Sequence, residues 1–433
     1  MEKSDKMVQN KNRGKEERKM DRIKNSLLEY RKLVFYGLCG VFIGCIVGVL
    51  DAGFGEVLLA ISSFRDGHIR WLLPFLAPAG ILIVWLYKRF GANAGKGMGL
   101  IFQVGHGEEE QIPLRLIPFV IGSTWLTHLV GGSAGREGVA VQIGATFSSW
   151  FGRKLCDKKA KNIFLIAGMA AGFAGLFGTP LAAVFFSLEV LVVGVLQYEA
   201  FVMAVFAAFS ASTVAGKLGL EKFTQPLGIA VSWNGKLFFV LCILGVCFGL
   251  VGMCFSSLLA FAKKTFGALI ENPIKRIAIG GESLTVLLFL FHMGRYCGLG
   301  TNLIGAAFYG EQIYAYDWIL KLGFTIVTLA VGFQGGEVTP LFSIGASLGV
   351  FIAPFFGIPS EFGAALGYAA VFGSATNILL APIFIGAEVF GYEYLPYFFL
   401  VCGVAYVVNG NGSIYSLQKI FEKSRWDKEL HKS

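Results

Sequence analysis

Charged residues are scarce in this sequence. Lys, Arg, Asp and Glu make up 15% of the 433 residues, whereas a soluble globular domain carries about 25%. Hydrophobic residues account for 55% of the chain, and the mean hydropathy is +0.65. A chain of this composition has too little polar surface to face water on all sides. A soluble fold is therefore excluded, and an all-α integral membrane protein is indicated.

The sequence also lacks the residue patterns of several function classes. Its eight cysteines include no CxxC pair and no Cys/His ligand spacing, so they are interpreted as small buried hydrophobes and no metal site is predicted. No HExxH motif or paired-carboxylate motif indicates an intramembrane enzyme. The net charge of +9 comes from basic residues at the ends and in loops, without an aromatic-lined basic stripe. We expect no enzyme activity, no cofactor and no nucleic-acid partner.

The N-terminal segment has no apolar core of the kind that a signal peptide requires. Residues 1–33 contain eleven Lys or Arg against six Asp or Glu, and the C-terminal stretch is also polar and net positive. The positive-inside rule then places both termini in the cytosol of a multi-pass cell-membrane protein, with an even number of crossings. We expect four segments: a basic tail 1–32, membrane repeats 33–220 and 221–418, and a tail 419–433.

Long apolar runs are present, and a membrane helix needs about 20 apolar residues. Four runs near or at that length are expected to form membrane helices: 71–87, 238–261, 319–333 and 341–356. Other apolar stretches, such as 181–191 and 378–390, are shorter and interrupted by Gly or Pro. Irregular backbone at membrane depth is tolerated only where protein or a water-filled cavity surrounds it. Broken helices are therefore expected.

The two halves of the chain resemble each other at an offset near 200 residues. Gly-Arg-Glu-Gly-Val at 135–139 lies over Gly-Glu-Val-Thr-Pro at 336–340, and an Ile-Gly-Ala string follows both at the same spacing. Further on, 181–190 lies over 380–389 with a Glu at matching positions. Paired halves with short, glycine-interrupted segments indicate a transporter whose binding site lies at the repeat interface. The sequence does not distinguish parallel from inverted halves.

In both copies a Gly-rich stretch leads directly into an apolar helix. A helix N-terminus offers unpaired backbone N–H groups and a partial positive charge, which together bind an anion without Lys or Arg. A carboxylate at this place, Glu137, would compete with a transported anion and leave only when protonated or displaced. The alternative is a simple ion pair with the neighbouring Arg136. The repeat favours the role in transport.

These motifs resemble those of a known family. Gly-Ser-Ala-Gly-Arg-Glu-Gly at 132–138, with Val-Gln-Ile-Gly at 141–144, is similar to the GREGP signature of the CLC chloride channels and transporters. Phe-Gly-Thr-Pro-Leu-Ala at 177–182 and Glu189 follow at the family's spacing, and the similarity extends over about 33–420. The resemblance implies a CLC-type fold of broken, tilted helices in two inverted repeats. It also implies a homodimer in the lipid bilayer, with a pore in each subunit.

The resemblance assigns roles residue by residue. Glu137 resembles the gating glutamate, and Tyr415 resembles the tyrosine whose hydroxyl lines the inner pore. The backbone amides of Glu337 and Val338 would face the anion. The expected anion-binding positions are Met98, Gly138, Val139, Val338, Thr339 and Tyr415.

The departures from the family pattern resemble its fluoride-specific bacterial branch. Val139 replaces the signature proline, Met98 replaces the usual serine, and a Glu and a Thr stand at 337 and 339. By this resemblance Thr339 and Tyr415 hold fluoride and Glu337 couples protons. Met98 is either a packing residue or a selectivity residue. The inner glutamate of the chloride/proton antiporters is absent, because Val190 takes its place.

The sequence thus predicts an antiporter that exports fluoride in exchange for protons and protects the cell from fluoride. The alternative within the family is a chloride channel or chloride/proton exchanger. An intramembrane enzyme or a non-transporting receptor has less support. Asp51 and Glu189 are interpreted either as functional acids or as structural groups such as helix caps. His106 and the acids 108–110 are expected to form a solvated loop rather than a metal cluster.

Overall fold

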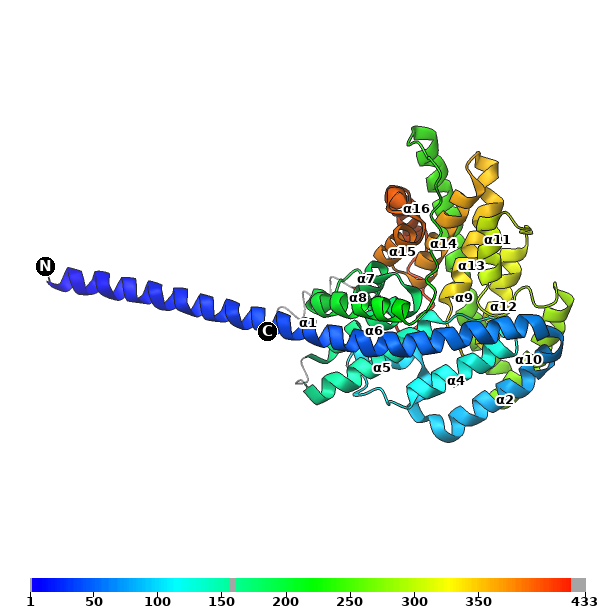
Figure 1. Ribbon diagram of the computed structural model, residues 1–433, viewed down its shortest axis with the longest axis horizontal. Coiled ribbons are helices and arrows are strands. Elements are labelled where there is room, and N and C mark those ends of the chain that lie inside the picture. The colour runs from blue at the N-terminus through cyan, green and yellow to red at the C-terminus, as the bar shows by residue number, and fades with distance from the viewer. Residues whose placement is uncertain (1, 156–159, 422–433) are drawn as a thin grey trace.

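The computed structural model describes residues 2–155 and 160–421, with side chains described from residue 24 onward. Within these ranges the chain is almost entirely helical (Figure 1). The first half contains α1 Glu2–Leu72, α2 Leu76–Leu86, α3 Met98–Gly105, α4 Leu116–Leu129, α5 Glu137–Leu155, α6 Lys161–Phe177, α7 Pro180–Glu189 and α8 Phe201–Lys217. The second half contains α9 Gly235–Leu269, α10 Pro273–Leu290, α11 Thr301–Tyr309, α12 Asp317–Val331, α13 Val338–Ile352, α14 Ser360–Thr376, α15 Leu380–Phe390 and α16 Leu395–Val408.

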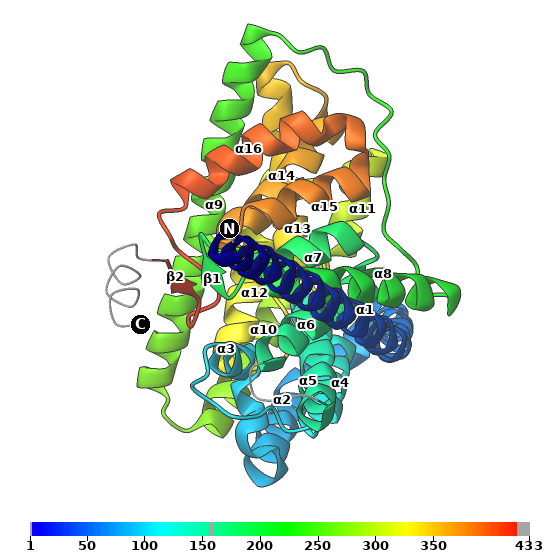
Figure 2. The same ribbon diagram turned by 90° about the vertical axis from the view of Figure 1, so that its left-hand side faces the viewer.

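Short elements interrupt or connect these helices. The short helical turns are Leu73–Phe75, Tyr87–Gly91, Ala92–Lys96, Tyr198–Ala200, Ala353–Phe356 and Tyr392–Tyr394. Two parallel two-residue strands, β1 Val192–Val193 and β2 Lys419–Ile420, pair near the end of α7 (Figure 2). The pairing places the end of the second half beside the middle of the chain. The expected C-terminal tail lies outside the described residues beyond Phe421.

The order of the helices repeats between the halves, which confirms the internal repeat. The segments α3 to α8 correspond in sequence order to α11 to α16. In each half two consecutive helices, α5 with α6 and α13 with α14, cross in close contact. A Cβ at Gly144 on α5 would overlap the carbonyl oxygen of Gly168 on α6, and Gly345 on α13 has the same relation to Gly367 on α14. These glycines let the helix backbones touch, as small residues do in membrane bundles. α6 and α14 are buried nearly all round and form the centre of the protein.

The membrane-helix predictions hold for some runs and fail for one. Both 238–261 and 341–356 lie in helices long and apolar enough to span a bilayer, as do parts of α1 and α8. The run 319–333 is the 15-residue helix α12. The run 71–87 is not one helix, because the chain turns through Leu73–Phe75 at Pro74 and restarts as α2. Proline lacks an N–H and clashes with the preceding turn, which ends the first helix there.

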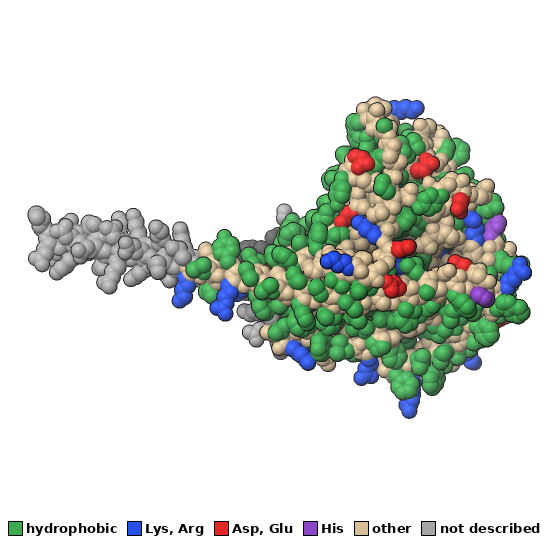
Figure 3. All heavy atoms as spheres, viewed as in Figure 1, with side chains coloured by type: hydrophobic (Ala, Val, Ile, Leu, Met, Phe, Trp, Pro, Cys, Tyr) green, Lys and Arg blue, Asp and Glu red, His purple; other side chains and the backbone are tan. Residues whose placement is uncertain are grey.

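α1 is a further helix long and apolar enough to span a bilayer, which was not among the four predicted runs. This helix packs along α8, α6 and α4, with a kink at His68 near its end (Figure 1). Hydrophobic side chains cover much of the molecular face in Figure 3. Exposed apolar residues occur along α1, α8, α9 and α16. A surface of this kind is suited to lipid rather than to water.

Candidate functional site

The loops that precede α5 and α13 meet at the centre of the molecule. Gly135 and Gly336 pair as an antiparallel bridge: the Gly135 N–H donates to the Gly336 carbonyl at 2.5 Å, and the Gly336 N–H donates back at 2.8 Å. A Cβ at Gly135 would lie 2.9 Å from Pro340 and 3.0 Å from the Gly336 oxygen. Only glycine allows this approach. The two loops therefore run in opposite directions where they touch, and two helix N-termini are brought together.

Glu137, the first residue of α5, reaches across this bridge to α13. Its side chain is 1% exposed. The Thr339 backbone N–H donates to Glu137 Oε2 at 3.1 Å, and the Thr339 hydroxyl lies 2.6 Å from both carboxylate oxygens. Distances of this size are typical of charge-assisted O–H···O⁻ bonds. The carboxylate of the first repeat is thus bound at the helix N-terminus of the second.

The ion pair with Arg136 is the weaker of the two contacts that the sequence suggested for Glu137. Arg136 Nε lies 3.9 Å from Glu137 Oε1, too far for a hydrogen bond. The backbone N–H of Arg136 donates to Glu137 Oε2 at 3.2 Å. Among the described residues, Arg136 Nε and Nη1 are buried without hydrogen-bond partners. The direct bonds of the Glu137 side chain therefore go to Thr339 and to backbone N–H groups.

A cavity of about 320 Å³ opens beside this contact, and we call it the site cavity. Four of the predicted residues line it: Met98, Gly138, Glu337 and Tyr415. Thr339 instead binds Glu137, and Val139 and Val338 are buried in the first turns of α5 and α13 without lining the cavity. Among the predicted residues, Thr339 therefore binds the Glu137 carboxylate, and four others line the adjoining cavity.

Two of the cavity residues carry polar groups suited to an anion or a proton. The Tyr415 ring packs against Phe102 with ring centroids 5.3 Å apart, and its hydroxyl makes no hydrogen bond to the described part of the chain. Glu337 precedes α13, and its side chain is 15% exposed with Lys263 Nζ 3.9 Å from Oε1. The hydroxyl is free to donate to a ligand. The Glu337 carboxylate lies on the wall of the site cavity.

Glu189 and Glu388 cap each other's helices. Glu189, at the end of α7, accepts from the backbone N–H groups of Leu379, Leu380 and Ala381 at 2.8–3.2 Å. Glu388, near the end of α15, accepts from the N–H groups at the start of α7 at 2.9 and 3.0 Å. Each carboxylate lies at the positive end of the partner helix dipole. The structure supports the capping interpretation of Glu189, and the reciprocal contacts show that α7 and α15 occupy equivalent positions in the two repeats.

Of the remaining polar candidates, His106 and Glu108 form hydrogen bonds or ion pairs with nearby groups, whereas Asp51 does not bond to any described residue. His106 bonds to the Leu191 carbonyl at 3.1 Å, while Lys419 pairs with Glu108 at 2.7 Å and lowers the pKa of that carboxyl. These contacts fit a loop anchored to the C-terminal strand. Asp51 is fully buried on α1, and its carboxyl makes no hydrogen bond to any described residue.

Sequence reasoning missed one buried charge near the site. Lys321 lies on α12 within an apolar run, and its side chain is 0% exposed. An ionisable residue inside a membrane segment is a functional candidate by default, so its position in the run was the signal.

Comparisons with known proteins identify the family of this chain. Residues 79–410 match the family described as voltage gated chloride channel. A chloride/fluoride channel protein of Pseudomonas syringae pv. tomato is 34% identical over 390 residues, which cover 86% of this chain and 84% of that protein. An H(+)/Cl(−) exchange transporter ClcA of Yersinia pseudotuberculosis is 26% identical over 386 residues, which cover 82% of this chain and 79% of the transporter.

Solved structures give the same result. The crystal structure of a CLC-type fluoride/proton antiporter is 51% identical, with a TM-score of 0.89, and covers 90% of this chain and 99% of that one. A slow cyanobacterial Cl⁻/H⁺ antiporter, 22% identical, shares the fold with a TM-score of 0.77 over 92% of this chain and 98% of its own. These names confirm the prediction of an ion-transport protein rather than an enzyme. The chain belongs to the CLC family of voltage gated chloride channels and transporters.

Proposed function

We propose that this protein exports fluoride in exchange for protons, and that Glu137 is its gate. One observation carries the proposal: the Glu137 carboxylate is bound by the backbone N–H and the hydroxyl of Thr339 at the first turn of α13. Donors at a helix N-terminus are an anion-binding arrangement. The carboxylate therefore occupies the place of a transported anion, and the two compete for the same donors.

Competition of this kind links anion movement to proton movement. A protonated Glu137 carries no charge for the helix dipole to hold, so proton binding releases the Thr339 donors to fluoride. When fluoride leaves, the carboxylate loses its proton and returns to Thr339. Each turn then moves fluoride one way and a proton the other. Glu337, on the wall of the site cavity, is the second proton carrier in this scheme, and the position next to Glu189 is occupied by the buried Val190.

The choice of fluoride rests on the available donors and on the relatives. Fluoride is small and strongly hydrated, so strong hydrogen-bond donors must replace its water. The hydroxyls of Thr339 and Tyr415 are such donors, one at the Glu137 carboxylate and one on the cavity wall. The relatives named above include a fluoride/proton antiporter at 51% identity and a chloride/fluoride channel protein at 34% identity.

A chloride/proton exchanger is the second candidate, because relatives at 26% identity bear that name. Liposomes with the purified protein separate the two when fluoride, chloride and pH are recorded together. We expect fluoride efflux much faster than chloride efflux, with protons moving the opposite way. Glu137→Gln should stop the proton movement, whereas Glu311→Gln, at an exposed residue after α11, should leave both fluxes unchanged. Chloride and fluoride moving at equal rates would favour the second candidate.

The homodimer and the placement in the cell membrane with both termini cytosolic stay predictions from the resemblance and the charge pattern. Site-specific cross-linking in the native membrane tests the dimer. Accessibility of single introduced cysteines to an impermeant reagent tests the side on which each terminus lies.

A further inference from the structure

Lys321 is a buried lysine that pairs with no carboxylate in the part of the chain that the structure describes. Its Nζ donates to the Ser133 hydroxyl at 2.9 Å, to the Tyr296 carbonyl at 3.1 Å and to the Gly298 carbonyl at 2.7 Å. An ammonium has three donor hydrogens, so these acceptors use all of them. Among the described residues no Asp or Glu oxygen lies within 4.0 Å of Nζ. A buried charge is retained at such a place only where it is fully hydrogen-bonded.

The acceptors of Lys321 belong to two separate loops that are also bonded to each other. Gly298 N–H donates to the Gly132 carbonyl at 3.0 Å, and Ala134 N–H donates to the Gly298 carbonyl at 3.3 Å. The Ser133 hydroxyl also lies 2.9 Å from the hydroxyl of Thr325 on α12. The loop 132–135, which leads into Glu137, is therefore held on one side by Lys321 and on the other by the bridge to Gly336.

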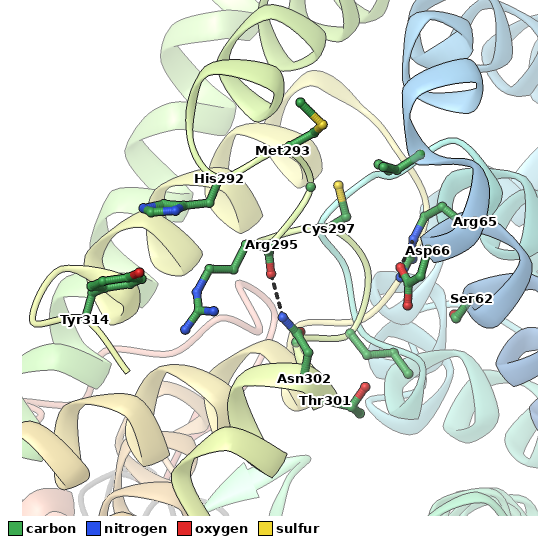
Figure 4. Close-up of a pocket in the computed structure, with 14 residues that line it drawn as sticks. Ser62, Arg65, Asp66, His292, Met293, Arg295, Cys297, Thr301, Asn302 and Tyr314 are labelled. Atoms are coloured by element: carbon green, nitrogen blue, oxygen red, sulfur yellow. Dashed lines mark hydrogen bonds and ion pairs between the residues drawn. The ribbon is translucent and has the colours of Figure 1, made fainter. Parts of the chain in front are cut away.

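The second loop forms the wall of another cavity. This cavity, of about 480 Å³, lies between Arg65 and Asp66 on α1 and the loop that carries His292, Arg295 and Cys297 (Figure 4). Arg295 pairs with Asp317 at the start of α12 at 2.8 Å, and the Tyr296 hydroxyl donates to the same carboxylate at 2.6 Å. The loop is thus fixed to α12, the helix that carries Lys321. Lys321 therefore connects the loop that carries Tyr296 and Gly298 to the loop 132–135.

A catalytic Ser–Lys pair is the other chemistry that this contact suggests, because Ser133 lies in a Gly-x-Ser-x-Gly string at 131–135. A lysine that acts as a general base needs a free lone pair and a substrate within reach. Here Nζ lies within hydrogen-bond distance of three acceptors, and both Ser133 and Lys321 are 0% exposed, so no substrate has access to the pair. The contact between Ser133 and Lys321 therefore fixes the loop 132–135 and does not form a catalytic pair.

We propose that Lys321 is a positioning residue for the gate, which keeps the loop 132–135 where the Glu137 carboxylate reaches Thr339. This inference rests on the function proposed above. When the ammonium is removed, the loop loses its anchor on α12 and the Glu137 carboxylate leaves Thr339 without having taken up a proton. Fluoride then passes without a proton, and the coupling between the two fluxes loosens.

The test compares Lys321→Met with wild type in liposomes, with fluoride and pH electrodes read together. We expect about tenfold more uncoupled fluoride flux. This is the factor by which loss of a hydrogen bond to a charged group changes the equilibrium between the state with Glu137 bound at Thr339 and the state with it released. Ser133→Ala, which removes only one acceptor, should shift the ratio the same way by less. Because Lys321→Met already removes the bond between Lys321 and Ser133, the double variant should be no worse than Lys321→Met alone. Lys275→Met, at an exposed lysine on α10, is the matched control.

The proton-to-fluoride ratio separates positioning from folding. A purely structural role would lower the melting temperature and the yield of Lys321→Met but leave the ratio of the folded protein at its wild-type value, and that result would overturn the inference. If Lys321→Met does not fold, an unchanged ratio in Ser133→Ala overturns it equally. A wild-type protein that moves no protons against fluoride would instead reject the proposed function itself.

Discussion

The hydroxyl of Thr339 lies 2.6 Å from both carboxylate oxygens of Glu137, although 202 positions separate the two residues. Glu137 is the first residue of α5 and Thr339 lies in the first turn of α13, so the contact joins the two halves through their helix N-termini. A hydroxyl has one proton, and both oxygens share it while the carboxylate is charged. A fluoride ion at this place would receive the same hydroxyl and the same backbone N–H. The Glu137 carboxylate and fluoride would therefore compete for the same donors on Thr339.

The Thr339 hydroxyl should be needed for fluoride. Thr339→Val keeps the shape of the side chain and the backbone N–H but removes the hydroxyl, so we expect fluoride turnover to fall by roughly tenfold or more. Thr339→Ser retains the hydroxyl and should restore most of the rate. The measurement is the initial rate of fluoride efflux from liposomes. Equal rates in the Val and Ser variants would show that the hydroxyl does not bind the anion.

Glu337 should matter for protons more than for fluoride. Glu337→Gln removes the titratable group from the cavity wall and keeps its size, so fluoride should still bind while proton transport falls. Fluoride binding by calorimetry and proton flux by pH electrode measure the two effects separately. A variant that still drives protons at the wild-type ratio would remove Glu337 from the proton path. Glu393→Gln, at an exposed residue before α16, is the control.

Tyr415 should contribute through its hydroxyl alone. Tyr415→Phe keeps the ring packing against Phe102, so the protein should fold with an unchanged melting temperature. Fluoride affinity should weaken by about tenfold, the effect expected for one lost donor to a charged ligand. Fluoride titration of both proteins at constant ionic strength provides the comparison. An unchanged affinity would place fluoride away from the cavity wall.

The two reciprocal caps should act on stability. Glu388→Gln removes the negative charge that binds two backbone N–H groups at the start of α7, at a cost of about 1–2 kcal/mol. Glu189→Gln should cost a similar amount at the start of α15. Thermal melting in detergent checks both variants. The proton-to-fluoride ratio of the folded variants should stay at the wild-type value, because neither carboxylate lies on the wall of the site cavity.

Sequence patterns predicted the repeat and a helix N-terminus in each copy because both depend on local spacing. The same patterns did not predict the direction of the halves, which came from the family resemblance, nor the reciprocal caps of Glu189 and Glu388, which depend on tertiary contacts. Hydropathy also treated 71–87 as one helix, since an average over apolar residues does not register the turn at Pro74. Lys321 was overlooked because its partners are backbone carbonyls and a serine, which no spacing rule connects to it.

One measurement tests the central claim most directly. Purified wild-type protein and Glu137→Gln are reconstituted into liposomes with an outward fluoride gradient, and external fluoride and pH are followed in the same vessel. With equal pH on both sides at the start, we predict that fluoride leaving wild-type liposomes drives protons inward. We predict that liposomes with Glu137→Gln move no protons at any fluoride gradient. Proton uptake that persists in Glu137→Gln, at the wild-type ratio to fluoride, would contradict a gate formed by this carboxylate.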